Sequence, residues 1–334
     1  MNKKKAIIIL NTYWLKEFID EAILPINLKN VEIIINKKDQ SIFKYLKKNK
    51  IDIKIHVTKK ITSKWFKNTF DIKNSILISA GSPWLISSDI INIFKKNILG
   101  IHQSPLPSMR GAVASYIRLF EIRALQTCLF VITSKIDEGK IALKKDIYIG
   151  KEHDTPFKIN NYLRKHNREL LKDFLYSYFV KKTKIQYTEQ NNFFSSYMPR
   201  LKTNINGWID WSLNVYELDR FIGAFDNPYP GAQTMLHGKK VNFFNVEMSC
   251  ADPSKHTFER GMVLRKFKDK IVISVNGGSL YVGKILLNGK DIFHKVKPGD
   301  IFYTKANKLD LIKRKNIFVK DSEIYTNQLK IKKI

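Results

Sequence analysis

A histidine and an aspartate follow two predicted strands in the first half of the chain. His102 ends the apolar run 98–103, and Asp137 comes directly after the run 128–135. A histidine beside a carboxylate can move protons and stabilise negative charge that develops during a reaction. If the two strands are neighbours, both side chains face one crevice, and the sequence predicts a candidate active site there. A histidine that serves only in packing is the alternative.

The elements that must position this pair alternate along the first half of the chain. The predicted strands are 6–10, 31–36, 53–57, 75–80, 98–103 and 128–135. The predicted helices are 14–23, 41–48, 63–70, 88–96, 113–124 and 156–181. Such alternation predicts βαβ crossovers and a mostly parallel sheet, in which ligands bind beyond the carboxyl ends of the strands.

The second half is built differently. A polar, irregular segment near 186–206 predicts a surface linker, and a short helix is predicted at 215–225. The predicted strands that follow are 232–236, 240–245, 261–267, 270–275, 279–283 and 301–303. Hairpin turns at 276–278 and 288–289 favour a small β-barrel. The lysine-rich segment after Lys305 predicts a solvated, partly frayed end.

The composition of this 334-residue chain excludes a disordered tail, because 44% of the residues are hydrophobic and 12% aromatic. Cys128 and Cys250 lie far apart and form no metal-spaced cluster, so we expect neither a disulfide framework nor a metal site. The apolar run 6–10 is too short for a signal peptide, and no run approaches a membrane span of about 18 apolar residues. We therefore expect a cytoplasmic protein without membrane insertion.

The net charge of +29 has two interpretations. The chain carries 59 Lys+Arg against 30 Asp+Glu, but only 10 of the basic residues are arginine, the side chain that favours bidentate phosphate recognition. A genome-wide bias toward A-rich codons explains this choice, and we favour it. A basic surface that serves a polyanionic partner is the alternative.

Several of these segments together resemble the formyltransferases that use 10-formyltetrahydrofolate. The signature of that family is matched by His102, Ser104, Leu106-Pro107, Arg110-Gly111 and Asp137-Glu138-Gly139. Three later segments look like the start of the C-terminal domain in methionyl-tRNA formyltransferases and in the formyltransferase half of bacterial aminoarabinose-modifying enzymes. These segments are 207–212, 221–225 and 227–232.

The resemblance implies an α/β fold with two domains. Residues 1–185 would form an N-terminal Rossmann-like formyltransferase domain with a mostly parallel sheet, and residues 186–206 a linker. Residues 207–318 would form a small OB-like β-barrel domain, followed by a basic tail over 319–334.

Two positions depart from the family pattern. Gly100 stands where the family carries an asparagine two residues before the histidine, and Phe130 stands where many members carry a second histidine. Glycine has no side-chain amide to polarise a formyl oxygen. We expect either a slower enzyme or a replacement donor, for which Gln103, Ser104 and a backbone N–H are candidates.

The family chemistry assigns roles to these residues. Formyl transfer to an amine passes through an oxyanion, which His102 would stabilise as a cation or as a neutral donor, while Asp137 would tune His102 and relay the amine proton. Ser104, Arg110 and Gly111 would form the turn at the substrate, with Arg110 either holding an acceptor phosphate or stabilising that turn. The folate would lie against two segments that offer free backbone groups. These are Gly81, Ser82, Pro83 and Trp84, and Ile136, Glu138 and Gly139.

The resemblance leaves the formyl acceptor open. We favour the amine of a nucleotide-linked amino sugar for surface polysaccharide synthesis. Methionyl-tRNA is the alternative, although Asn11-Thr12-Tyr13 stands where initiator-tRNA enzymes typically carry Gly-Thr-Pro-Glu-Phe. A catalytically weakened folate- or sugar-binding relative is a third hypothesis, which Gly100 would explain. A homodimer is left open.

Overall fold

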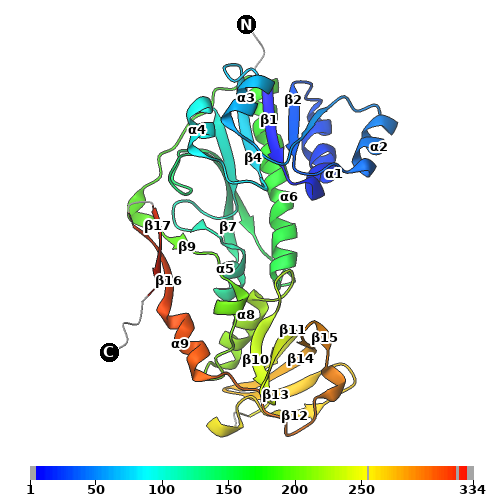
Figure 1. Cartoon of the computed structure of the whole chain (residues 1–334), viewed down its shortest axis with the longest axis vertical. Helices are drawn as coiled ribbons and strands as arrows, with labels where there is room; N and C mark the ends of the chain where they lie inside the picture. The colour runs from blue at the N-terminus through cyan, green and yellow to red at the C-terminus, as the bar shows by residue number, and fades with distance from the viewer. Residues whose placement is uncertain (1–4, 254–255, 321–322, 329–334) are drawn as a thin grey trace. The chain divides into compact units, whose positions relative to one another are not determined.

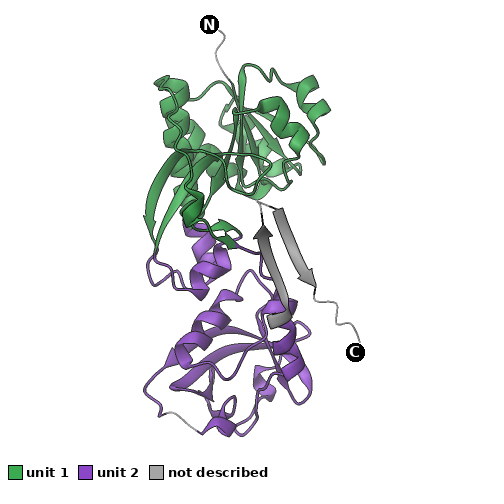
Figure 2. Ribbon diagram, turned by 90° about the vertical axis from the view of Figure 1, so that its left-hand side faces the viewer, with its two compact units in different colours: residues 1–111, 124–148, 163–197 green, residues 112–123, 149–162, 198–334 purple. Residues whose placement is uncertain are grey.

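The computed structural model describes residues 5–253, 256–320 and 323–328 (Figure 1). The chain divides into two compact units, coloured separately in Figure 2. Unit 1 contains residues 1–111, 124–148 and 163–197, and unit 2 contains residues 112–123, 149–162 and 198–334. Because the two units interleave along the chain, the domain boundaries drawn from the sequence stay predictions.

A seven-stranded sheet forms the centre of unit 1, in the order β3-β2-β1-β4-β5-β7-β8. Its strands are β1 Lys5–Leu10, β2 Val31–Ile35, β3 Lys54–Val57, β4 Ser75–Ala80, β5 Ile98–His102, β7 Ala124–Val131 and β8 Ile141–Tyr148. The four pairings from β3 to β5 are parallel, whereas β5–β7 and β7–β8 are antiparallel. The predicted α/β fold with a mostly parallel sheet is confirmed.

Strand β1 shows why this sheet is covered on both faces. Ala6, Ile8 and Leu10 lie in one buried cluster, whereas Ile7 and Ile9 lie in another. The surrounding helices are α1 Leu15–Phe18, α2 Gln40–Lys48, α3 Ser63–Thr69, α4 Ser88–Phe94 and α6 Pro156–Leu175. Side chains of α1, α2 and α6 join the first cluster, and those of α3 and α4 the second. Strands buried on both faces read as continuous apolar runs, as β1 does.

One part of the predicted sheet is wrong. The strand expected at 128–135 is β7, Ala124–Val131, and it runs antiparallel to β5 with Cys128 opposite His102. The carboxyl ends of these two strands therefore lie at opposite edges of the sheet. Strand β8 was not predicted, because its run Ile141–Tyr148 is interrupted by charged residues, as is common in edge strands. Hydrophobic periodicity does not carry strand direction, so only the pairing reveals it.

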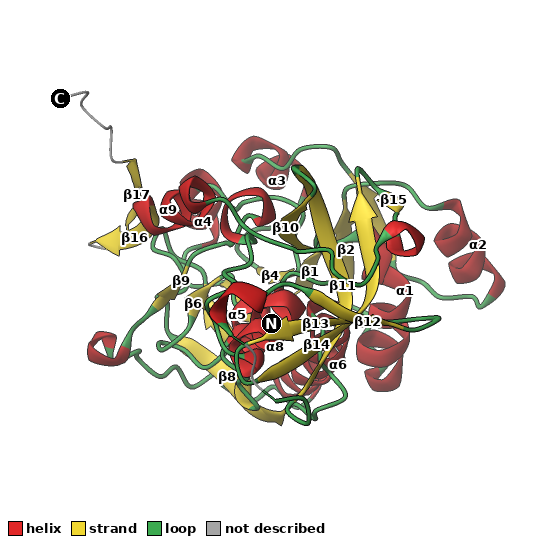
Figure 3. Ribbon diagram, turned by 90° about the horizontal axis from the view of Figure 1, so that it is seen from below, coloured by secondary structure: helices red, strands yellow, loops and turns green. Residues whose placement is uncertain are grey.

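An antiparallel sheet forms the core of unit 2, in the order β10-β11-β14-β13-β12 with β15 paired to β14 (Figure 3). Its strands are β10 Ala232–Leu236, β11 Lys239–Ser249, β12 Val263–Lys266, β13 Ile271–Val275, β14 Gly278–Leu287 and β15 Lys290–Asp291. The predicted hairpin turn at Asn288 and Gly289 joins β14 to β15, and both residues have positive φ, 50° and 80°.

The segment expected as strand 301–303 forms only single bridges. Ile301 bridges to Met262, next to β12, and Tyr303 bridges to Met235 in β10. Because β12 and β10 are the two ends of the sheet order, this segment contacts both edges of the sheet.

The described residues contain four further α-helices and four further strands. The helices are α5 Ala114–Leu119, α7 Thr203–Asn206, α8 Val215–Ala224 and α9 Ala306–Arg314, and the short strands are β6 Arg110–Gly111, β9 Tyr197–Met198, β16 Lys315–Lys320 and β17 Glu323–Gln328. Helix α9 and the hairpin β16–β17 stand where a partly frayed end was expected, and residues 329–334 of that end lie outside the described part of the chain. No helix in the described residues is long and apolar enough to span a bilayer.

Candidate active site

Strand β5 ends at His102, whose side chain is buried, with 7% of the residue exposed. The ring nitrogen Nε2 lies 2.6 Å from the carbonyl oxygen of Met109. The Ser104 hydroxyl donates to the same oxygen at 2.6 Å. The Phe130 ring meets the imidazole edge to face, with centroids 6.3 Å apart. The histidine is thereby held in one orientation by the turn that follows its own strand.

The Met109 carbonyl also decides which ring nitrogen of His102 carries the proton. A carbonyl oxygen can only accept, so Nε2 of His102 must be the donor. Neutral His102 therefore has a lone pair on Nδ1, and protonation adds an N–H there. The expectation that neutral His102 could itself donate to an oxyanion is wrong in this geometry, because its one N–H is already bonded to Met109.

Asp137 lies opposite this free nitrogen. Its Oδ2 atom stands 3.6 Å from His102 Nδ1 and accepts a hydrogen bond of 2.8 Å from the backbone N–H of Gly111. Gly111 has φ +92°, a conformation that favours glycine and presents its N–H to the carboxylate. The two side chains meet as predicted, although not because their strands end side by side. The loop between β7 and β8 folds back and carries Asp137 to the end of β5.

Arg110 is buried, with 6% exposed, and its guanidinium is engaged within unit 1. Nη1 forms an ion pair of 3.0 Å with Glu138, and Nη2 donates to Asn192 Oδ1 at 2.7 Å. Burial lowers the pKa of Arg110, and the Glu138 and Asp137 carboxylates partly offset this effect. Of the two roles expected for Arg110, stabilising the turn is the one that these contacts perform.

In both segments expected to receive folate, side chains already bond to some of the backbone groups. Both follow strands of unit 1, and β4 is the parallel neighbour of β5, so Gly81 to Trp84 begin at the sheet edge where His102 lies. Ser82 Oγ accepts from the Trp84 backbone, and Trp84 Nε1 donates to the Lys59 carbonyl. In the other segment, the carbonyl oxygens of Asp137 and Gly139 both accept from Gln190. The Ser82 hydroxyl also donates to the Trp84 carbonyl. The expectation of free backbone groups is therefore wrong for the Asp137 and Gly139 carbonyls and for the N–H and carbonyl of Trp84, because side chains already bond to them.

The candidate replacement donors for the asparagine expected at position 100 differ in whether their hydrogens already have an acceptor. The Ser104 hydroxyl hydrogen is directed at the Met109 carbonyl, so it is not available to an oxyanion in this arrangement. Gln103 is half-buried and follows His102 directly. Gln103 stays a predicted replacement donor.

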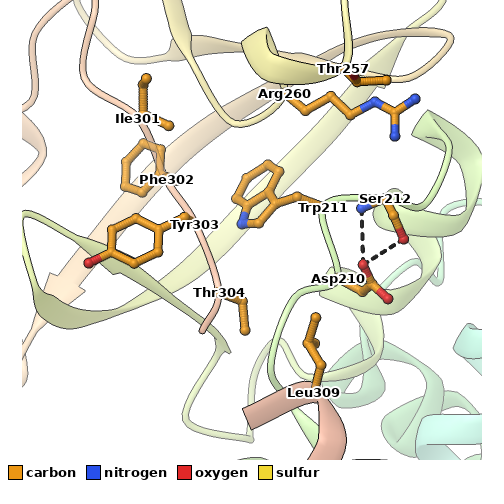
Figure 4. A pocket seen from close by; sticks show the side chains of 10 residues that line it. All are labelled: Asp210, Trp211, Ser212, Thr257, Arg260, Ile301, Phe302, Tyr303, Thr304 and Leu309. Carbon is orange, nitrogen blue, oxygen red and sulfur yellow. Dashed lines mark hydrogen bonds between the residues drawn. The ribbon is translucent and has the colours of Figure 1, made fainter. Parts of the chain in front are cut away.

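Unit 2 holds a separate hollow of about 310 Å³, shown in Figure 4. It is lined by Asp210, Trp211, Ser212, Thr257, Arg260, Ile301, Phe302, Tyr303, Thr304 and Leu309. Trp211 is buried, donates from Nε1 to Thr234 Oγ1 and stacks near Phe302. Its role is packing inside this unit, and none of the predicted site residues lines the hollow.

Sequence reasoning missed the side chains that brace the turn. Gln190 and Asn192 both contact Arg110, yet they belong to the polar segment interpreted as a surface linker. No periodicity or spacing distinguishes an amide that docks on a buried arginine from one that faces water. The signal that the sequence offers is the number of amide side chains in this segment, and that number is as typical of a surface linker as of a segment that docks on a buried arginine.

The chain combines two kinds of unit. One is an α/β unit with a His–Asp pair at the end of a central strand, and the other is a separate antiparallel-sheet unit. Residues 4–175 match the family described as Formyl transferase, and residues 202–314 match Formyl transferase, C-terminal domain. The chain belongs to the formyl transferase family.

Individual relatives are similar to this chain in sequence at low identity. A methionyl-tRNA formyltransferase from Nitrosomonas eutropha is 24% identical over 241 residues, covering 69% of this chain and 73% of that protein. The bifunctional polymyxin resistance protein ArnA of Wigglesworthia glossinidia brevipalpis is 27% identical over 236 residues, which span 68% of this chain but only 36% of that protein.

A solved structure shows the same fold over nearly its whole length. It is an N-formyltransferase from Helicobacter canadensis in complex with folinic acid and dTDP-3-aminofucose. The TM-score is 0.60 at 20% identity, and the match covers 84% of this chain and 98% of that one.

Proposed function

We propose that this chain transfers a formyl group from 10-formyltetrahydrofolate to the amine of a nucleotide-linked amino sugar, in surface polysaccharide synthesis. The observation that carries the proposal is the 3.6 Å approach of Asp137 Oδ2 to His102 Nδ1 in a chain of the formyl transferase family. The Helicobacter canadensis structure supports the acceptor class, because its partner molecules are a folate and a nucleotide-linked amino sugar.

The reaction moves one formyl carbon between two nitrogens. The acceptor amine attacks the formyl carbon, a new C–N bond forms, and the carbonyl oxygen becomes an oxyanion. Protonated His102 donates from Nδ1 to that oxygen, because its Nε2 is bonded to Met109. Asp137, through a water molecule, accepts the amine proton and passes it to the folate nitrogen as the old C–N bond breaks.

The formyl donor, 10-formyltetrahydrofolate, would lie at the edge of the sheet between the segment 81–84 and the turn 136–139. Backbone groups other than the two carbonyls bonded to Gln190 and those of Trp84 bonded to Ser82 would recognise the pterin, with the side chains of Trp84 and Ile136 as apolar neighbours. For unit 2 we infer an OB-like barrel, supported by the bridges of segment 301–303 to both edges of its sheet.

Methionyl-tRNA is the second candidate acceptor. The curated relatives that support it include the enzyme from Nitrosomonas eutropha, and the net charge of +29 is suited to a polyanion. Both hypotheses assign the same tasks to His102 and Asp137. They differ only in the acceptor.

A coupled assay with 10-formyltetrahydrofolate tests the proposal against a panel of nucleotide amino sugars and methionyl-tRNA. Loss of the oxyanion donor in His102→Ala should lower kcat by about 10²–10³. Asp137→Asn should also lower kcat. The matched controls are His237→Ala, whose side chain is 69% exposed, and Asp89→Asn, which is exposed. Full turnover in both site variants would contradict catalysis by this pair, and turnover of methionyl-tRNA alone would favour the second candidate.

A further inference from the structure

We propose that Gln190 is a positioning residue, whose side-chain amide holds the Asp137–Gly139 turn so that the Asp137 carboxylate faces His102. This inference rests on the proposed function, because it assigns Gln190 a task in that same site. Gln190 lies 53 residues after Asp137 in the chain and contributes no group to the reacting atoms themselves.

Two hydrogen bonds tie the Gln190 amide to the turn. Its Nε2 atom donates to the carbonyl oxygen of Asp137 at 2.8 Å and to that of Gly139 at 2.7 Å. One amide nitrogen carries two hydrogens, so both donors are used, and the two carbonyls are bridged across Glu138. The bridge sets the distance between the two ends of this three-residue turn.

Arg110 orients the same amide. Its Nε and Nη2 atoms donate to Gln190 Oε1 at 3.2 and 2.8 Å. A guanidinium has no acceptor, so the oxygen of the amide must face Arg110 and the nitrogen must face the turn. The hydrogen-bond network thus leaves one assignment for the amide, and all of its polar atoms are used.

The backbone conformation of Asp137 is one that these hydrogen bonds would stabilise. Asp137 has φ +51°, a left-handed conformation that L-residues other than glycine adopt rarely. The Gly111 N–H bond to Oδ2 holds the side chain of Asp137, whereas the Gln190 amide holds its backbone. Gly111 directly follows Arg110, so the turn, the carboxylate and the amide are fastened to the same short strand, β6.

Gln190→Glu tests this role with little change in shape. The carboxylate keeps its interaction with Arg110, but it has no hydrogen to donate and places a negative oxygen against two carbonyls. Gln186→Glu is the matched control, because Gln186 lies in the same segment, is exposed and has no hydrogen bond recorded among the described residues. Gln190→Met, which is similar in length and uncharged, serves if the glutamate variant does not fold.

The first readout is independent of formyl transfer. In protein labelled with ¹⁵N-histidine, the His102 resonances are assigned by their loss in His102→Gln and recorded at one fixed pH. We expect Gln190→Glu to move the Nδ1 resonance in the direction seen in Asp137→Ala, and Gln186→Glu to leave it in place. The second readout is kinetic: a 1 Å misplacement of the carboxylate should lower kcat by roughly 10- to 100-fold.

A His102 resonance in Gln190→Glu that coincides with the wild type would overturn the positioning role. So would a thermal midpoint that falls with no separate effect on kcat in the folded protein. If the wild type transfers no formyl group to any acceptor, the proposed function fails, and the resonance comparison still decides whether Gln190 places Asp137 against His102.

Discussion

Gly100 of β5 and Phe130 of β7 are register partners on adjacent antiparallel strands, and a Cβ atom on Gly100 would stand 3.1 Å from Phe130 Cε1. Ile132 Cγ1 would lie 3.0 Å from the same atom. These distances are tighter than ordinary van der Waals contact. The two positions at which the resemblance predicts other residues therefore belong to one local arrangement, in which Phe130 and Ile132 fill the space that a side chain at position 100 would need.

Placing asparagine at position 100 should destabilise the chain. Overpacking of a tight core costs about 1–3 kcal/mol, so Gly100→Asn should lower the free energy of unfolding by that amount. Phe130→Leu replaces the ring with a smaller side chain. In the double variant, the loss of unfolding free energy should be smaller than the sum of the two single losses by at least about 0.5 kcal/mol. Urea denaturation of the four proteins measures this coupling. Additive effects would show that the two positions do not share this space.

Unfolding in acid should report on a buried carboxylate of β2. Burial by itself would raise the pKa of Glu32, but Lys5, His56 and Lys54 outweigh it, so the pKa lies below its ordinary value. A lowered folded-state pKa means that the unfolded state binds the proton more readily. Stability is then present above the ordinary glutamate pKa of about 4.3 and is lost as the pH falls through the folded value.

The matching measurement compares wild type with Glu32→Gln. The difference in unfolding free energy between the two proteins should shrink as the pH is lowered from about 5 to about 3. Glu138→Gln is unsuitable as a control because it touches the site, whereas Glu189→Gln changes a side chain that is 73% exposed. A difference that stays constant with pH would mean that the ion pairs of Glu32 do not stabilise the fold.

The two cysteines should differ in reactivity. Burial raises the pKa of the Cys128 thiol, and its sulfur donates to the Ser104 carbonyl at 3.6 Å. Cys250 is exposed. At neutral pH the folded protein should release one equivalent of thiolate from an aromatic disulfide reagent, and the denatured protein two. Cys250→Ser should abolish the fast equivalent, and a fast reaction that persists in this variant would place Cys128 in contact with solvent.

Salt dependence should discriminate between the two acceptors. Binding that depends on release of counterions from tRNA falls steeply between about 50 and 200 mM salt, by about 10³–10⁵ for six to ten phosphate contacts. If the acceptor is a nucleotide-linked sugar, kcat/KM should change far less over this range. Filter binding of methionyl-tRNA and the coupled assay provide the two measurements. A steep loss of tRNA affinity from a tight complex at low salt would favour the tRNA enzyme.

Much of the architecture follows from local patterns. The strand over Ser75–Ala80 and the strand over Ala232–Leu236 were predicted with the bounds that the structure has. Turn residues bound both segments, and most residues of each strand are buried in its sheet. The turn at Asn288 and Gly289 follows equally, because few residue pairs adopt two successive positive φ angles.

The sequence by itself determined the α/β alternation, the antiparallel second half and the candidate residues His102 and Asp137, since each depends on side chains close together in the chain. Only the tertiary structure decided that β7 runs antiparallel to β5, that the Met109 carbonyl selects the proton-bearing nitrogen of His102, and that Gln190 braces the turn of Asp137. These relationships depend on hydrogen bonds between backbone groups and distant side chains. Every residue carries the same backbone donor and acceptor, so no sequence pattern specifies which partner each one finds.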